Sequence, residues 1–172
     1  ALARFAHQNA PVITAVNGAA GGGGFSLALA GDIILASERA KFVSAYTASG
    51  LTPDGSSTYF LAKYVGLLRA KELMLTNRVL TAAEAQDWGL VTRVVAPEDL
   101  LNEARALAAQ FANGPTQAYG GVKRLLDSAY TASLESQMDK ETRSIAAMMR
   151  THDGPHGIDS FLAKQKPVFK GE

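Results

Sequence analysis

The spacing of apolar and polar residues changes character near Pro97. Before it, short runs of β-branched and aliphatic residues alternate with glycine-rich turns and helical stripes, an order typical of β–α–β units in an α/β fold. The runs predict strands at 12–16, 32–36, 41–44 and 90–95, with 12–16 and 32–36 as neighbouring buried strands. The stripes predict helices at 1–10, 25–30, 58–65 (capped by Ser57), 69–76 and after the capping box of Thr81 and Glu84.

After Pro97 every apolar stripe has helical spacing, beginning with Leu100, Leu101, Ala104, Leu107, Ala108 and Phe111. Further stripes follow at 122–129, 134–149 and around Phe161. We therefore expect an α/β region over 1–96 and an all-α region over 97–172. So few strands do not make a stable sheet alone, so we expect that the chain begins within a domain or needs a partner fragment.

Composition narrows the class of protein. The 172 residues carry 17 lysines and arginines against 16 aspartates and glutamates, a net charge of +1 that predicts no nucleic-acid or anionic membrane surface. Cysteine is absent, which excludes disulfides and cysteine-based metal sites. His152 and His156 are separated by Gly154 and Pro155, so we predict a surface loop there and no metal centre.

The sequence shows neither a membrane-spanning run nor a secretory signal. No apolar run reaches the ~20 residues that span a bilayer, and the start of the chain, with Arg4, His7 and Gln8, has no secretory pattern. We expect a cytoplasmic protein without a membrane segment, with an organelle matrix as the alternative location.

We predict a glycine-rich turn between strand and helix at Asn17–Gly24, and its run of four glycines, Gly21–Gly24, has four interpretations. A dinucleotide fingerprint fails because Ser26 stands where the third glycine belongs, and no Gly-Lys-Ser/Thr supports a P-loop. A hydrolase elbow fails because Ser26 comes ten residues after Val16 rather than directly after the strand. Tight helix–strand packing and an oxyanion hole made of backbone N–H groups both remain open.

A set of ordered segments carries a resemblance to a known family. The longest is PVITAVNGAAGGGGFSLALAGDI at 11–33, and it is followed by AKF at 40–42, GLTPD at 50–54, YVG at 64–66, ELMLTNR at 72–78, AQDWGLV at 85–91 and FLAK at 161–164. Together they resemble the enoyl-CoA hydratase/isomerase (crotonase) superfamily over essentially the whole chain.

The resemblance implies a fold and an assembly. It implies the C-terminal part of a crotonase-type β–β–α superhelix, followed by a helical trimerisation region that builds homotrimers or homohexamers. The substrate would be an acyl-CoA thioester, with coenzyme A as part of that substrate and no separate cofactor. The family's N-terminal third, with a second oxyanion donor and part of the CoA site, has no counterpart here.

The resemblance also assigns residues. Gly23 matches an oxyanion donor, and Asp54 matches the catalytic aspartate of some isomerases and of aromatic-acyl-CoA dehalogenases. Ala19, Gly22, Ser26 and Tyr46 would line the substrate pocket, and Phe161 and Lys164 would contact CoA, often that of a neighbouring subunit. Two alternatives stay open: Asp54 capping the helix near Ser57, and Phe161 packing in a core.

Several activities fit these residues. Hydratases of the family use two glutamates, at positions where this sequence has Ser26 and Tyr46, so a single aspartate favours an enoyl-CoA or ring-opening phenylacetyl-CoA-type isomerase. The alternatives are a hydratase, a dehalogenase-like hydrolase (which Glu72–Arg78 and Asp87–Gly89 particularly resemble) and a non-catalytic CoA-binding or assembly subunit.

Overall fold

The computed structural model describes residues 2–172. Its contacts divide the chain into two compact units. The first comprises Val12–Ala106 with the residues before His7, and the second comprises His7–Pro11 with Leu107–Glu172. The regions 1–96 and 97–172 inferred from the sequence pattern stay a prediction.

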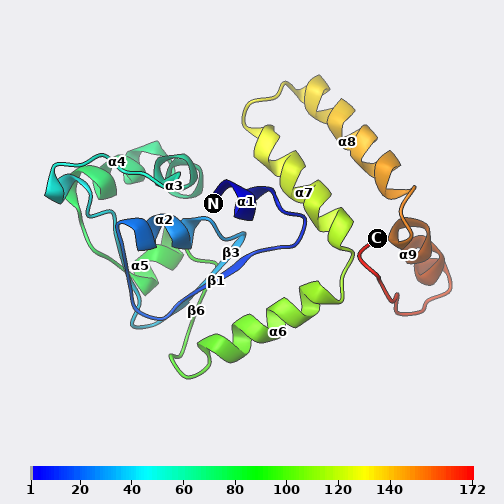
Figure 1. Ribbon diagram of the computed structural model, residues 1–172, viewed down its shortest axis with the longest axis horizontal. Coiled ribbons are helices and arrows are strands. Elements are labelled where there is room, and N and C mark those ends of the chain that lie inside the picture. Colours follow the sequence, from blue (N-terminus) through cyan, green and yellow to red (C-terminus); the bar gives the residue numbers. More distant parts are fainter. Residues whose placement is uncertain (1) are drawn as a thin grey trace. The chain divides into compact units, whose positions relative to one another are not determined.

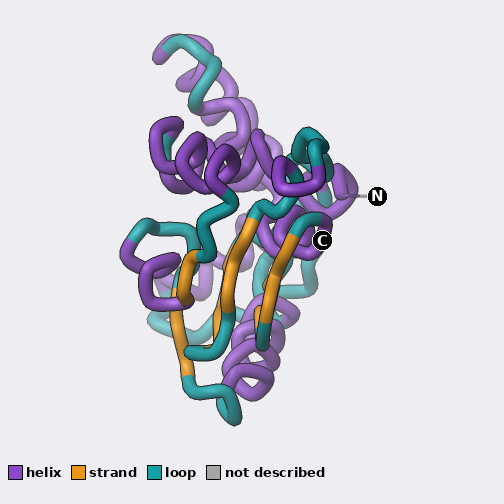
Figure 2. The backbone as a smooth tube through the Cα atoms, turned by 90° about the vertical axis from the view of Figure 1, so that its left-hand side faces the viewer, coloured by secondary structure: helices purple, strands orange, loops and turns teal. Residues whose placement is uncertain are grey.

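The first unit is built around two small sheets (Figures 1 and 2). In one, β1 (Ile13–Val16), β3 (Ile33–Ser37) and β6 (Arg93–Val95) run parallel in the order β1-β3-β6. In the other, β4 (Lys41–Val43) lies between β2 (Ala19–Gly21), parallel to it, and β5 (Leu80–Thr81), antiparallel to it. Alternating strands and helices confirm the predicted α/β class.

The predicted pairing of the first two strands is confirmed, because Ile13 of β1 lies in register with Ile33 of β3. The β1 strand is half-buried along its length rather than buried. Two strands were missed: β2 lies within the expected glycine turn, and β5 has only two residues. The β6 strand begins at Arg93 and not at Leu90, because the N–H groups of Leu90 and Val91 donate to the Ala85 carbonyl and not to a neighbouring strand.

The helices follow the apolar stripes closely. They are α1 (Leu2–His7), α2 (Gly23–Leu29), the short 3₁₀ helix η1 (Thr47–Ser49), α3 (Ser57–Val65), α4 (Leu67–Thr76), α5 (Ala82–Asp87), α6 (Leu100–Ala112), α7 (Thr116–Ala129), α8 (Leu134–Met148) and α9 (Asp153–Leu162). The capping box of α5 is confirmed, with Thr81 and Glu84 bonded reciprocally. The predicted cap of α3 is wrong, because Ser57 is its first helical residue and Ser56, with a φ of 64°, precedes it.

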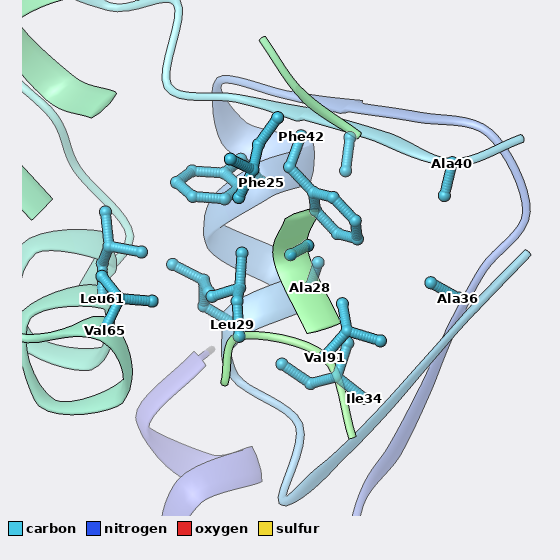
Figure 3. Close-up of a cluster of buried hydrophobic side chains, with 14 of the residues drawn as sticks. Phe25, Ala28, Leu29, Ile34, Ala36, Ala40, Phe42, Leu61, Val65 and Val91 are labelled. Atoms are coloured by element: carbon cyan, nitrogen blue, oxygen red, sulfur yellow. The ribbon is translucent and has the colours of Figure 1, made fainter. Parts of the chain in front are cut away.

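The core of the first unit surrounds α2 (Figure 3). Phe25 of α2 meets Phe42 of β4 edge to face, with ring centroids 6.5 Å apart. Leu29 of α2 and Leu61 of α3 are buried in the same cluster. Fully burying side chains of this size stabilises a fold by roughly 1.5–3 kcal/mol each. This packing fixes α2, and with it the glycine run at its start.

The second unit is helical, and α7 and α8 form a hairpin within it (Figure 1). The surface loop predicted around His152 and His156 is wrong, because α9 begins at Asp153 and includes Pro155. Proline is tolerated in the first turn of a helix, where an N–H group has no partner inside the helix. The two imidazole rings therefore stack, with centroids 5.6 Å apart. None of the helices described over 2–172 is both long and apolar enough to cross a membrane.

Candidate active site

The glycine run places a sharp bend between β2 and α2. Gly22 has a φ of 51° and a ψ of −120°, a conformation that favours glycine. Its N–H donates to the Val43 carbonyl at 3.2 Å, and its carbonyl accepts the Ser26 N–H at 3.0 Å. Since the Gly22 N–H is used by β4, it is not available to a substrate oxygen.

Gly23 follows this bend as the first residue of α2. The first N–H groups of a helix have no carbonyl partner within the helix. A Cβ placed on Gly23 would meet no atom within 4 Å, so the space in front of this residue is open. Ala19, predicted to line the same pocket, lies exposed in β2. Packing within the chain therefore does not require glycine at position 23, whereas close approach of a ligand to the backbone would.

Ser26 lies on the buried side of α2 and is only 1% exposed. Its Oγ donates to the backbone carbonyl of Asp54 at 2.9 Å and lies 3.4 Å from the carbonyl of Gly22. The same Oγ is 3.0 Å from the phenol oxygen of Tyr46. Ser26 thus joins the start of α2 to two loop residues that come much later in the chain.

Tyr46 and Asp54 are joined directly. The Tyr46 hydroxyl donates to Asp54 Oδ1 at 2.6 Å, with the phenol half-buried and the carboxylate exposed. Burial raises the pKa of Tyr46, and the hydrogen bond to Asp54 raises this pKa further, while the bond to Ser26 acts in the opposite direction. The net pKa lies above the ordinary value of 10.0, so Tyr46 keeps its proton near neutral pH and acts as a donor to the carboxylate.

The start of α3 is served by the backbone of Asp54 and not by its side chain. The Asp54 carbonyl accepts the Ser57 N–H at 3.2 Å and the Ser57 hydroxyl at 2.9 Å. The residue before the helix makes no side-chain cap. The Asp54 carboxylate therefore points its Oδ1 at Tyr46 instead of capping the helix, which leaves it available for chemistry.

The direct bond between Tyr46 and Asp54, and the role of Ser57, were not predicted from the sequence. The loop between them turns back on itself through η1, where the Leu51 N–H donates to the Tyr46 carbonyl at 3.1 Å and Gly50 has a φ of 69°. Glycine at 50 and 55 flanking Pro53 was the available signal for such a turn. It indicates a reversal of the chain but not which side chains the reversal brings together.

Phe161 and Lys164 belong to the second unit, at the end of α9. Phe161 is 81% exposed, so it does not pack in the core of this chain. Its ring borders an apolar hollow of about 400 Å³ together with Ile158 and Phe169. Contact of Phe161 and Lys164 with CoA stays a prediction. Over residues 2–172, no group of three or more histidines and carboxylates is arranged to hold a metal.

Comparison with known proteins identifies the family. The sequence profile of the family described as enoyl-CoA hydratase/isomerase matches residues 1–172. The chain is 41% identical over 169 residues to the 1,2-epoxyphenylacetyl-CoA isomerase of Escherichia coli K12, covering 98% of this chain and 64% of that protein. It is 38% identical over 137 residues to a 4-chlorobenzoyl coenzyme A dehalogenase of Arthrobacter, covering 80% of this chain and 50% of the dehalogenase.

A solved structure agrees with these relatives. The crystal structure of an enoyl-CoA hydratase/isomerase from Cupriavidus metallidurans superposes with a TM-score of 0.92 at 39% identity, covering 99% of this chain and 64% of that one. The match confirms the predicted crotonase-type fold. The chain thus spans less than two-thirds of the length of these proteins, 64% of the Escherichia coli isomerase and of the Cupriavidus protein and 50% of the dehalogenase. A match along the entire chain, in both sequence and fold, makes it a member of the enoyl-CoA hydratase/isomerase family.

Proposed function

We propose that the protein is an acyl-CoA isomerase that moves a proton through a thioester enolate, with Asp54 as general base and then general acid. One observation carries the proposal. The Asp54 carboxylate is exposed and is bonded to a Tyr46 hydroxyl that keeps its proton, while Ser26 is buried against backbone carbonyls. A single positioned carboxylate suits proton transfer between two carbons of one substrate.

In this mechanism Asp54 accepts a proton from the carbon chain of the acyl group and later returns it to another carbon of that chain. Between the two steps negative charge rests on the thioester oxygen as an enolate. The Gly23 N–H would donate to that oxygen, and removing one such donor typically costs about 10²–10³-fold in rate. Ala19 and Gly22 would shape the wall of the pocket around it.

A hydratase is less consistent with this site. Adding water across a double bond requires one group to activate the water and another to protonate the carbon. Ser26 has no carboxylate, and its hydroxyl is bonded to the Asp54 carbonyl. Tyr46, with its raised pKa, is a poor base near neutral pH.

A dehalogenase-like hydrolase is the second candidate, because 38% identity to a dehalogenase accompanies an exposed carboxylate that could attack an aromatic ring. The higher sequence identity, 41%, to the 1,2-epoxyphenylacetyl-CoA isomerase of Escherichia coli favours the isomerase, either of enoyl-CoA or of a ring-opening phenylacetyl-CoA type. Under the same proposal the protein acts as a homotrimer or homohexamer in the cytoplasm, and Phe161 and Lys164 contact CoA.

The experiment compares wild type with Asp54→Asn in the full-length protein, using crotonyl-CoA hydration and 3-enoyl-CoA isomerisation as assays. We expect Asp54→Asn to lose about 10²–10⁴-fold in isomerisation, the usual contribution of a general acid–base group, with acyl-CoA affinity nearly unchanged. Asp99→Asn, an exposed aspartate of the same unit, is the control.

Rapid hydration by wild type, or full isomerisation by Asp54→Asn, would overturn the proposal. Turnover of 4-chlorobenzoyl-CoA in place of isomerisation, abolished by the same substitution, would establish the hydrolase candidate instead.

A further inference from the structure

Around Asp54, the Tyr46 and Ser26 hydroxyl groups have fewer protons to donate than there are acceptor atoms within reach. The Tyr46 hydroxyl has one proton and two acceptors within reach, Asp54 Oδ1 at 2.6 Å and Ser26 Oγ at 3.0 Å. The Ser26 hydroxyl also has one proton, which it donates to the Asp54 carbonyl at 2.9 Å. Because a hydroxyl oxygen has two lone pairs, Ser26 can donate to this carbonyl and accept from Tyr46 at the same time.

We propose that Ser26 is a positioning residue that acts on Asp54 through Tyr46. Whenever Asp54 is protonated, Ser26 Oγ accepts the hydrogen bond that the Tyr46 hydroxyl donates. This inference rests on the proposed role of Asp54 as the proton-transferring group. Ser26 is only 1% exposed, so under this inference it acts behind Tyr46 rather than on the substrate itself.

The network then has two arrangements. While Asp54 is ionised, the Tyr46 hydroxyl donates to Oδ1, because a charged acceptor binds more strongly than a neutral one. When Oδ2 takes a proton from the substrate carbon, Oδ1 becomes the neutral carbonyl oxygen of a carboxylic acid and accepts more weakly. The Tyr46 hydroxyl turns to Ser26 Oγ, and it returns to Oδ1 when Oδ2 delivers the same proton to the second carbon. No proton is gained or lost in the cycle.

The consequence is that Tyr46 and Ser26 have opposite effects on the basicity of Asp54. Tyr46 alone would favour the ionised carboxylate and make it reluctant to accept a proton. Ser26 supplies the partner that Tyr46 needs in the protonated state, so it restores basicity to Asp54. The effect of Ser26 therefore exists only when Tyr46 has a hydroxyl proton to share.

The charged groups to consider around this network are Asp54 and the side chains of the helices that pack nearby. Asp54 is the charged group whose field acts on the Tyr46 phenol. The α2 helix carries no charged side chain. On α3, which packs against α2, Lys63 donates to the Tyr59 hydroxyl at 2.6 Å. On α4, which packs against η1, Arg69 lies over the Trp88 ring and Glu72 forms an ion pair with Arg78, while Lys71 is exposed.

Ser57 provides a matched control. It is also 1% exposed, and its hydroxyl donates to the same Asp54 carbonyl at the same 2.9 Å. The structure assigns it no bond to Tyr46 among the hydrogen bonds of residues 2–172. Ser57→Ala therefore removes an equivalent support of the Asp54 backbone without touching the proton shared with Tyr46.

The experiment measures kcat and KM for isomerisation against pH in the full-length protein for wild type, Ser26→Ala, Ser57→Ala, Tyr46→Phe and Ser26→Ala/Tyr46→Phe. Ser26→Ala should shift the acidic limb of the kcat profile to lower pH by roughly 0.5–1 unit, the equivalent of one neutral hydrogen bond, and lower the plateau kcat with KM unchanged. Tyr46→Phe should shift the limb to higher pH. In the Tyr46→Phe background, Ser26→Ala should cause no further shift.

Two results would overturn the inference: an equal shift in Ser57→Ala and Ser26→Ala, or a Ser26→Ala shift that persists without the Tyr46 hydroxyl. Ser26→Cys, whose thiol is a weaker acceptor, should shift the limb in the same direction and serves if Ser26→Ala does not fold. Asp54→Asn separates the two levels of proposal. An active Asp54→Asn removes the proposed function and this inference together, whereas an inactive one with an unshifted Ser26→Ala removes the inference alone.

Discussion

The side chain of Asp153 holds Gly171 in place, because its Oδ2 accepts the Gly171 N–H at 2.7 Å. Its Oδ1 accepts the Lys170 N–H at 2.8 Å, and its own N–H donates to the Glu172 carbonyl at 3.1 Å. The residue is only 4% exposed. Burial alone would raise the pKa of Asp153, but hydrogen bonds from Lys170, His152 and Gly171 outweigh it and hold the pKa below its ordinary value. The end of the chain is thus fastened to the start of α9 by an ionised carboxylate.

This contact predicts a pH-dependent contribution to stability. A carboxyl whose pKa is lowered by folding stabilises the fold above its unfolded pKa, and that contribution is lost as the pH falls through the folded pKa. Asp153→Asn should lower the free energy of unfolding by about 1.5–3 kcal/mol near neutral pH, the usual worth of hydrogen bonds to a charged group. The difference from wild type should narrow in acid, as measured by urea unfolding of the full-length protein over a pH series. Asp159→Asn, exposed on the same helix, is the control, and a difference independent of pH would contradict the assignment.

Gly31 leaves no room for a side chain beside Thr14. A Cβ added at Gly31 would lie 2.6 Å from Thr14 Oγ1 and 2.8 Å from Thr14 Cγ2, and that hydroxyl is committed to the Ala28 carbonyl at 3.0 Å. We expect Gly31→Ala to lower the free energy of unfolding by about 1–3 kcal/mol through overpacking. Gly24→Ala places its methyl group in open space and should not lower the free energy of unfolding. Denaturant unfolding of the two variants measures the difference.

A double-mutant cycle with Thr14→Ala would isolate this clash. Removing Oγ1 and Cγ2 relieves the two shortest contacts, although Thr14 Cβ would still lie 3.2 Å from the new atom. Gly31→Ala should therefore cost less in the Thr14→Ala background than in wild type. Equal costs in the two backgrounds would show that the destabilisation has another origin.

The parts of the fold that were predicted are those whose signal is local. Val12–Val16 is a β-branched run, and the four residues Ile13–Val16 form β1. The Thr81 and Glu84 spacing produces its capping box. By contrast, β2 consists of Ala19–Gly21, whose residues have low strand propensity, and it exists because β4 lies alongside it. Its formation depends on a tertiary contact that no local pattern contains.

The candidate site, like the fold, was predicted only in part. Asp54, Ser26 and Tyr46 were named from the sequence because each stands at a position of the family's pattern. Their hydrogen bonds were not, because they join α2 to a loop that reverses through a 3₁₀ turn. Residue type predicted which groups were present, and only the folded backbone determined that the proton of Tyr46 has two acceptors.

The last prediction concerns Lys164, which follows α9 with a φ of 54° and is exposed. If its ammonium group contacts the phosphates of CoA, as we propose, Lys164→Ala should weaken CoA binding by up to about tenfold at low salt, where exposed charges are least screened. The loss should shrink as salt is added, because screening removes the same attraction in wild type. Titration calorimetry with CoA at two salt concentrations measures both effects in the full-length, assembled protein. Lys140→Ala on α8 removes an equal charge elsewhere in the same unit and should change neither affinity nor salt dependence. A Lys164→Ala protein with wild-type affinity at both salt concentrations would exclude Lys164 from the CoA site, whereas an equal loss in Lys140→Ala would attribute the effect to net charge alone.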